Sequence, residues 1–202
     1  MRTPGSRSDT TWPIIREASI SLIYEHGFES MNTRQLAELV QMKPGSLYYY
    51  FSSKEELLNR LVTEVLDEIV DDLELKLADV DTGLGGLDTF ISGLVEWHVN
   101  RHKETYIALM DTRSLSEEKL ARYMESRDRY DQLLDEILER CRREGSIGDI
   151  PVRITRLSIL TMITGITSWF KPAGEANLDD LRDFYVTAVR RFVGAVPVGT
   201  RS

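Results

Sequence analysis

Cysteine, proline and long hydrophobic runs are all scarce in this chain of 202 residues. Its one cysteine, Cys141, has no partner for an intrachain disulfide. The longest stretch without a charged residue, Leu157–Phe170, has 14 residues and includes serine, threonine and glycine, whereas a bilayer-spanning helix needs about 20 mostly apolar residues. The N-terminus also lacks the apolar core of a signal peptide. We therefore expect a soluble, cytoplasmic protein with no membrane partner.

Proline, which ends helices, does not occur between Pro44 and Pro151. The sequence also has no internal repeat and no strand-like alternation bounded by turn residues. Apolar residues instead recur at helical spacing, which predicts an all-α fold with about nine helices. Three helices are expected before residue 52, and the later ones are expected at 53–79, 87–101, 104–112, 116–143, 151–170 and 178–193. Residues 1–11 and 195–202 are expected to be a disordered arm and tail.

Positive charge is in short supply as well, because 25 Lys and Arg face 33 Asp and Glu, for a net charge of −8. This balance argues against a general polyanion binder. Residues 1–60 nevertheless carry seven basic and seven acidic side chains, which leaves 18 against 26 in residues 61–202. Such asymmetry favours two separate units. We expect an N-terminal domain over 12–58 and a larger domain over 59–194.

Residues 28–54 predict two short helices that cross at a sharp angle. Asn32 or Thr33 suits the N-cap of the first helix, and Ala37 is small enough for a second helix to cross close by. Pro44 suits the first position of that second helix. The helix after Pro44, expected to reach residue 51, exposes mainly small and hydroxyl-bearing residues. This arrangement is typical of a helix-turn-helix.

The same segment is rich in the hydroxyl and cationic donors that bind a phosphate backbone. These residues are Thr33, Arg34, Lys43, Ser46, Tyr48, Tyr49, Tyr50 and Lys54. An aromatic run on a helix more often packs in a core, so the tyrosines have a competing structural interpretation. Consecutive helical residues point about 100° apart, however, so Tyr48, Tyr49 and Tyr50 cannot share one buried face. At least one of them is expected to be exposed.

Residues 12–58 resemble the N-terminal DNA-binding domain of the TetR family of bacterial repressors. The matching segments are HGF at 26–28, TRQLA at 33–37, GSLYYYF at 45–51 and SKEELL at 53–58. The resemblance implies three N-terminal helices for DNA and a larger helical domain for ligand binding and dimerisation. Position by position, it implies phosphate contacts from Thr33, Arg34, Lys43, Ser46, Tyr48, Tyr49 and Lys54, and base-edge contacts from Pro44, Gly45 and Tyr50.

The chain departs from the family pattern at two positions. Gln41 stands in the turn where the family usually has glycine, and a left-handed conformation there would cost about 1 kcal/mol. Lys43 stands where the family commonly has a serine or threonine cap, and a lysine side chain cannot accept a backbone hydrogen bond. We expect the fold to tolerate both changes, and we expect Lys43 to add a phosphate contact.

In the larger domain, Arg127 lies on an otherwise apolar helical stripe between Tyr123 and Tyr130. A buried guanidinium needs a partner, and two interpretations follow. One is an internal salt bridge, for example to Asp111 or Glu104. The other is an anion hook for a carboxylate, phosphate or thioester ligand.

His98 shares the apolar face of its expected helix with Leu94 and Arg101. It stands four positions before His102, a spacing that permits metal ligation on a helix. No HExxH motif and no nearby cysteine accompanies the pair. We therefore expect satisfied or solvated histidines, no metal site and no cofactor.

The last two helices have the features of a dimer interface. Small residues at 158, 161, 165 and 168 would let another helix approach closely, and the final helix has an apolar face with Phe184, Tyr185 and Phe192. The family resemblance implies that these helices form a four-helix bundle with a second subunit. We expect a homodimer that binds a palindromic operator in double-stranded DNA.

The segment GITSWFKPAG at 165–174 is similar to a Trp-aromatic-x-Pro-x-Gly segment in TetR members that control fatty-acid or steroid degradation. Those members release DNA on binding acyl-CoA thioesters, so the resemblance implies an acyl-CoA effector, while other hydrophobic effectors stay open. The residues expected to contact the ligand are Trp97, Arg101, Tyr123, Arg127, Tyr130 and Trp169.

Three classes of function are weighed against these observations. A ligand-responsive transcriptional repressor is favoured by the helix-turn-helix pattern. A helical enzyme built around His98 or Arg127 lacks a recognisable nucleophile–base pair or carboxylate pair, so we expect no enzymatic activity. A helical adaptor that has lost DNA binding is the third class, and operator binding would distinguish it from the first.

Overall fold

The computed structural model describes residues 7–110, 115–171, 174 and 176–195. Throughout these residues the chain is helical and contains no strand. The helices are α1 (Arg7–His26), α2 (Thr33–Leu39), α3 (Pro44–Leu47), α4 (Lys54–Leu77), α5 (Gly83–Asn100), α6 (His102–Met110), α7 (Glu117–Glu144), α8 (Val152–Thr164), α9 (Ile166–Trp169) and α10 (Leu178–Phe192). The all-α prediction is confirmed.

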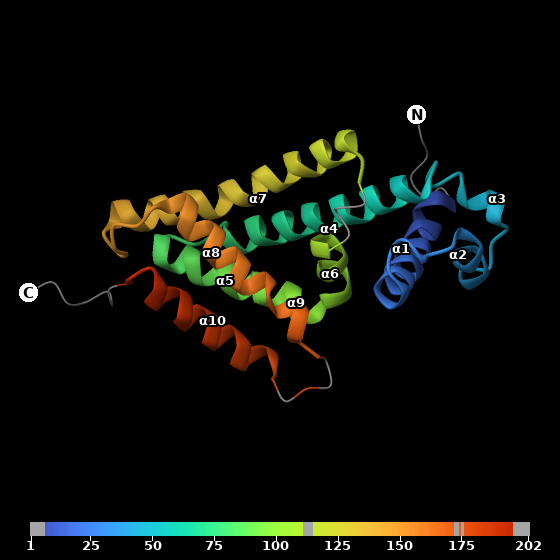
Figure 1. Cartoon of the computed structure of the whole chain (residues 1–202). Coiled ribbons are helices and arrows are strands. Elements are labelled where there is room, and N and C mark those ends of the chain that lie inside the picture. The colour runs from blue at the N-terminus through green and yellow to red at the C-terminus, as the bar shows by residue number, and fades with distance from the viewer. Residues whose placement is uncertain (1–6, 111–114, 172–173, 175, 196–202) are drawn as a thin grey trace, which may run out of the picture.

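Helix α4 extends from the N-terminal helices into the larger helical body (Figure 1). Helices α1, α2 and α3 gather at its N-terminal end, and α7 runs alongside it. Its 24 residues correspond to about 36 Å of helix. The boundary expected at residue 58 therefore lies inside one continuous helix, so no flexible linker separates the two parts.

The start and the buried face of α4 follow directly from its sequence. The Ser53 hydroxyl accepts a hydrogen bond from the Glu56 N–H at 3.0 Å, as the SKEE segment predicts for a capping box. Apolar residues spaced three and four apart then form one buried stripe. The stripe comprises Leu57, Leu58, Leu61, Val62, Val65, Leu66, Ile69, Val70 and Leu73. It packs against α5 and α7 to form the centre of the core.

The helix expected over 151–170 is divided at Gly165 into α8 and α9, which brings the number of helices in the described residues to ten. Hydroxyl side chains explain the break. Thr161 donates to the Leu157 carbonyl at 2.7 Å, Thr164 donates to the Leu160 carbonyl at 2.8 Å, and similar bonds continue into α9. Such back-bonding competes with the helical ladder and often bends helices.

Two further boundaries differ from expectation. Helix α1 begins at Arg7, so residues 7–11 are helical and are not part of a disordered arm. The other residues of the expected arm and tail, 1–6 and 196–202, lie outside the described residues. Helix α3 ends at Leu47, because 48–50 form a turn. In the described part of the chain, none of the helices has the length and apolar character needed to cross a bilayer.

Candidate nucleic-acid interface and internal cavity

The two short helices of the N-terminal part are held by a small apolar contact. Leu36 and Ala37 of α2 and Leu47 of α3 are fully buried. The Asn32 side chain caps α2 by accepting a hydrogen bond from the Arg34 N–H at 2.8 Å. Because these few contacts already fix α3 against α2, the outer face of α3 is free to carry residues that do not pack.

The turn before α3 contains Gln41 and Lys43, the two residues at which the sequence departs from the pattern it otherwise resembles. Gln41 adopts a left-handed conformation with φ of 54°, which is the conformation expected to cost a residue with a side chain about 1 kcal/mol. Lys43 occupies the N-cap of α3 without a side-chain capping bond, and Pro44 fills the first helical position. A side chain added at Gly45 would meet nothing within 4 Å. The leading end of α3 therefore faces open space.

The three consecutive tyrosines do not pack together. Tyr49 is 91% exposed and Tyr48 is also exposed, whereas Tyr50 is half-buried against the core. The prediction that at least one tyrosine must face solvent is confirmed. An almost fully exposed phenol contributes little to folding, and its hydroxyl is free to donate to an external acceptor.

Lys54 has a structural partner as well as a place in a surface groove. Its Nζ donates to the Glu29 carbonyl at 2.8 Å and lies 4.5 Å from the centre of the Phe28 ring. It also lines a shallow groove together with Thr33 and Tyr48. The structure thus brings these three predicted DNA-contacting residues to one surface and ties Lys54 to the loop before α2.

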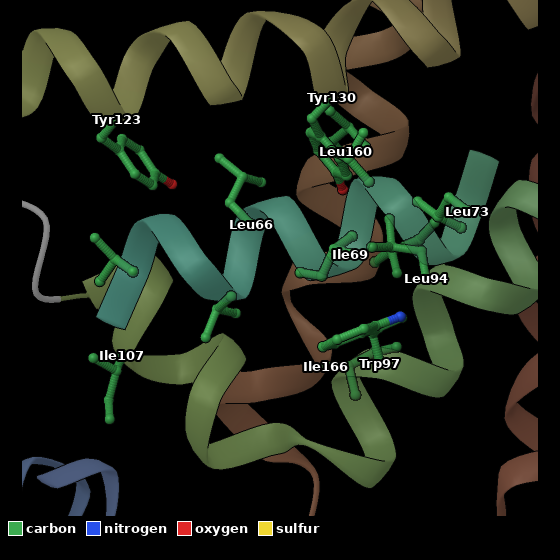
Figure 2. Packing of buried hydrophobic residues seen from close by; sticks show 14 of the residues in the cluster. Leu66, Ile69, Leu73, Leu94, Trp97, Ile107, Tyr123, Tyr130, Leu160 and Ile166 are labelled. Atoms are coloured by element: carbon green, nitrogen blue, oxygen red, sulfur yellow. The ribbon is translucent and has the colours of Figure 1, made fainter. Parts of the chain in front are cut away.

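An internal cavity of about 50 Å³ lies in the larger helical part, where α4, α5, α6, α7 and α8 meet. Its walls are Leu66, Ile69, Leu94, His98, Thr105, Ala108, Leu109, Tyr123, Arg127, Tyr130 and Thr164. Figure 2 shows Tyr123 and Tyr130 directed from α7 toward α4, next to Leu66 and Ile69. Three of the six predicted ligand residues, Tyr123, Arg127 and Tyr130, therefore share one cavity.

Arg127 has an intrahelical partner at this cavity. Its Nε donates to Asp131 Oδ1 at 3.1 Å, and its guanidinium lies 5.1 Å from the centre of the Tyr130 ring. Burial by itself would lower the pKa of Arg127, but the neighbouring tyrosines and Asp131 outweigh it and raise the pKa overall. The expected partner Glu104 is wrong, because Glu104 pairs with Arg16 and Arg101; Asp111 lies outside the described residues.

His98 is the polar residue of the cavity that the sequence interpretation misjudged. It is 4% exposed, and neither ring nitrogen has a hydrogen-bond partner. Burial lowers its pKa to about 4, so the imidazole is neutral near pH 7. The expectation of a satisfied or solvated histidine is therefore wrong here. A signal existed in the sequence, since His98 occupies the apolar face of α5 defined by Leu87, Ile91 and Leu94.

His98 and His102 do not form a helical metal-binding pair. Arg101 has φ of −122° and ψ of 39° and ends α5, so His102 begins the next helix. The His102 ring instead packs edge-on against Tyr24, with ring centres 5.3 Å apart. In the described part of the chain, no three histidine, cysteine or carboxylate side chains gather as metal ligands would.

The other three predicted ligand residues lie outside the cavity. The Trp97 indole donates to Asp72 at 2.8 Å. Arg101 stacks on Trp97, 4.3 Å from the ring centre, and pairs with Glu68 at 2.6 Å. Trp169 is half-exposed on α9, and Pro172 of the same motif lies outside the described residues. Arg101 departs from the face of His98 because α5 ends at that residue.

Helix α6 connects the cavity with the N-terminal helices. Arg16 of α1 pairs with Glu68 of α4 at 3.3 Å and with Glu104 of α6 at 3.6 Å, and Arg101 also contacts both carboxylates. The next residue of α6, Thr105, lines the cavity, as do Ala108 and Leu109 one turn further along. A displacement of α6 at the cavity would therefore disturb the ion pairs that hold α1.

Two larger hollows lie elsewhere on the molecule. One of about 770 Å³ contains this ionic cluster between α1, α4 and α6, and one of about 690 Å³ lies between the C-terminal end of α4, α5 and α7. Charged side chains form much of the walls of both hollows. The small cavity is the better candidate for an apolar ligand because most of its walls are aliphatic or aromatic and it contains an unpaired polar group.

Comparison with known proteins finds a family match for both parts of the chain. Residues 15–61 match the family model described as bacterial regulatory proteins, tetR family. Residues 85–193, more than half of the chain, match the model of the tetracyclin repressor-like C-terminal domain. The chain belongs to the TetR family.

Individual TetR relatives extend over nearly the whole chain. The transcriptional repressor KstR2 of Mycolicibacterium smegmatis is 22% identical over 188 residues, which cover 92% of this chain and 90% of the relative. A tetR-family regulatory protein of Rhodococcus RHA1 shares the fold with a TM-score of 0.86 at 21% identity, over 95% of this chain and all of that one. AibR, solved with isovaleryl coenzyme A and operator DNA, has a TM-score of 0.82 at 22% identity, over 92% and 100%.

Membership of the TetR family relates the exposed α3 face to the internal cavity. This TetR-family protein is a ligand-responsive, DNA-binding transcriptional repressor, and its relatives are transcriptional regulators. The first site lies on the N-terminal helices, and the second lies in the larger helical body, where α4, α5, α6, α7 and α8 meet.

Proposed function

We propose that this TetR-family repressor binds a palindromic operator as a homodimer and leaves it when an acyl-CoA effector enters the internal cavity. The observation that carries the proposal is the position of α6. Glu104 on α6 pairs with Arg16 of α1, while Thr105 and Leu109 on the same helix line the cavity. A ligand in the cavity and the DNA-binding helices therefore act on one common element.

The size of the cavity supplies a reason for release. A volume of about 50 Å³ is far below the roughly 300–1,000 Å³ of pockets that enclose drug-sized ligands. An effector therefore has to displace α6 or α7, and it binds only to the displaced arrangement. A ligand with such differential affinity shifts the population away from the arrangement in which Arg16 and Glu104 are paired.

The chemistry of the walls indicates the effector class. Leu66, Ile69 and Leu94 offer an apolar surface for an acyl chain or ring, and Arg127 offers a cation beside it. An acyl-CoA thioester combines an apolar tail with phosphate and carbonyl oxygens. The AibR structure, which contains isovaleryl coenzyme A, supports this class.

On the DNA side, the hydroxyls and cations around α3 suit a phosphate backbone. We assign phosphate contacts to Thr33, Arg34, Lys43, Ser46, Tyr48, Tyr49 and Lys54, and base-edge contacts to Pro44, Gly45 and Tyr50. The exposure of Tyr49 and the open space around Gly45 support this assignment. A recognition helix of this kind enters the major groove, and a dimer places two such helices about one turn of DNA apart.

Exposed apolar side chains on the last helices support the dimer. Ile154 and Leu157 of α8 and Phe184 and Phe192 of α10 are all exposed in the single chain. Large apolar residues that gather on two neighbouring amphipathic helices usually mark an interface. Pairing these faces with a second copy would form the four-helix bundle expected of the last two helices.

Fluorescence anisotropy with DNA from upstream of the protein's own gene tests the proposal, with sedimentation velocity as the measure of assembly. The protein is expected to sediment as a dimer and to bind a palindrome within that DNA. Micromolar dodecanoyl-CoA or isovaleryl-CoA should release it, whereas free CoA should not. A stable monomer would contradict the dimer, and binding that no thioester affects would contradict the effector class.

A further inference from the structure

Both ring nitrogens of His98 are buried in the cavity without a hydrogen-bond partner. Thr105 donates to the His102 carbonyl at 3.1 Å, Thr164 donates to the Leu160 carbonyl at 2.8 Å, and Arg127 donates to Asp131. Neither nitrogen of His98 has a hydrogen-bond partner, although the residue is only 4% exposed. The cavity thus contains one complete donor–acceptor group that the protein leaves unused.

A neutral imidazole offers one N–H donor and one acceptor nitrogen. Burial of such a group without a partner is unfavourable, and buried polar groups in native proteins are nearly always hydrogen-bonded. The apolar face of α5 would accept leucine at this position without that cost, since Leu87, Ile91 and Leu94 occupy the preceding positions of the same face. A histidine there therefore fits a ligand that brings its own hydrogen-bonding atom into the cavity.

We propose that His98 determines effector specificity by hydrogen-bonding a keto or hydroxyl oxygen on the apolar part of the ligand. This inference rests on the proposed function of the cavity as the effector site. A saturated chain would fill the same space but leave the imidazole unpaired, and sites built to bond a ligand oxygen discriminate strongly against analogues that lack it. The effector is then an oxygenated acyl chain or ring, and not a plain alkyl chain.

A matched pair of small anions tests the inference without assuming a thioester. Cyclohexylacetate and 4-oxocyclohexylacetate share a ring for the apolar walls and a carboxylate for Arg127, and they differ only in the keto oxygen. Their dissociation constants are measured by isothermal titration calorimetry on the full-length protein. The wild type is expected to bind the keto acid at least tenfold more tightly than the saturated acid.

Two variants separate His98 from general effects of a buried polar group. His98→Leu should reduce the preference for the keto acid to less than twofold. Asn59→Leu is the matched control, because Asn59 of α4 is also buried with its Oδ1 unpaired but does not line the cavity. It should keep the wild-type preference. Thermal unfolding of both variants verifies that they are folded.

A second pair, dodecanoyl-CoA and 3-oxododecanoyl-CoA, separates the inference from the proposed function. If thioesters release the operator but the wild type favours neither oxygenated ligand, the effector site stands and the role of His98 is overturned. If the keto acid is favoured through His98 while no thioester binds, the thioester class fails and the role of His98 is supported. If neither acid and neither thioester binds, or if His98→Leu keeps the preference, the inference is overturned.

Discussion

The exposed end of α3 and the internal cavity use polar side chains under opposite conditions. Around α3, Tyr49 and Lys43 face water, so their polar groups are solvated whether or not DNA is bound. In the cavity, His98 is enclosed without a partner and Arg127 is half-buried beside Asp131. The first site can be built from surface residues with almost no loss of stability. The second places polar groups inside the core, which lowers the stability of the fold.

This contrast predicts where substitutions act. A surface residue that contacts only DNA should change operator affinity and leave the fold unchanged. A cavity residue should change stability and effector binding together, because its neighbours depend on it for packing and for charge. A variant that breaks either rule would show that its residue has been assigned to the wrong one of these two sites.

The largest expected effect is the pH dependence caused by His98. Its pKa is about 4 in the folded protein and near 6.5 when unfolded, so the unfolded state takes up the proton first as the pH falls. The free energy of unfolding should therefore decrease between pH 6.5 and 4 by roughly 3 kcal/mol at 1.36 kcal/mol per pKa unit. Urea titrations at several pH values measure this loss, which is complete below pH 4.

Urea titrations of variants separate the contribution of His98 to the pH dependence from that of the carboxylates. His98→Leu should remove the loss, and it should also make the protein more stable at pH 7. His26→Asn is the matched control, because His26 is exposed. An identical slope in wild type and His98→Leu would show that His98 is not buried neutral in solution.

Arg127→Ala tests the charged wall of the cavity. Hydrogen bonds to charged groups contribute about 1.5–3 kcal/mol, or roughly ten- to hundredfold in affinity, so binding of dodecanoyl-CoA should weaken by that factor. The fold should survive, because Asp131 keeps its ion pair with Arg156. Titration calorimetry and thermal unfolding measure the two effects.

Arg129→Ala on the same helix is the control for Arg127→Ala. Arg129 pairs with Glu74 at 2.5 Å on the exposed face of α7, so its loss should leave effector binding unchanged. If Arg127→Ala unfolds early and loses both operator and effector binding, Arg127 belongs to the core and is not an anion hook.

Tyr49→Ala probes the surface site. Loss of one hydrogen bond costs about 0.5–1.5 kcal/mol, so operator affinity in an anisotropy titration should fall about two- to twelvefold for every DNA sequence tested. The melting temperature should not change, because the side chain is 91% exposed. Tyr49→Phe keeps the ring and removes the hydroxyl, and an equal loss in both variants would assign the effect to the hydroxyl. A lowered melting temperature would contradict the surface assignment.

The smallest effect is expected in the turn before α3. Gln41→Gly should raise the free energy of unfolding by about 0.5–1 kcal/mol, because relief of left-handed strain exceeds the added chain entropy of glycine. Gln41→Ala retains the Cβ and should leave the stability nearly unchanged. Urea titrations compare the two, and equal stabilities would show that the φ of 54° carries no strain.

Local patterns predicted most of the fold and the exposed polar face around α3. The Ser53 cap, the proline at the start of α3, the left-handed Gln41 and an exposed tyrosine all follow from rules that act within a few residues. The partner of Arg127 was also available locally, since Asp131 lies four positions along the helix, a standard pairing distance. The prediction named more distant carboxylates and missed it.

The cavity required tertiary information. Periodicity placed His98 and Arg101 on one face, but α5 ends at Arg101, and that residue joins an ion cluster with α1, α4 and α6. Trp97 likewise turned out to bind Asp72. Helix ends redirect side chains by changes in φ and ψ that hydrophobic spacing does not encode.

By itself the sequence determined the all-α class, the helix-turn-helix and its polar outer face, because helix caps, proline and apolar spacing act over a few residues and need no distant partner. Only the tertiary structure decided which polar side chains meet at the cavity and which of them is left unpaired. The walls of the cavity come from α4, α5, α6, α7 and α8, and burial is a property of all five together. A histidine in an apolar stripe is visible in the sequence, but its missing partner is visible only once those helices are packed.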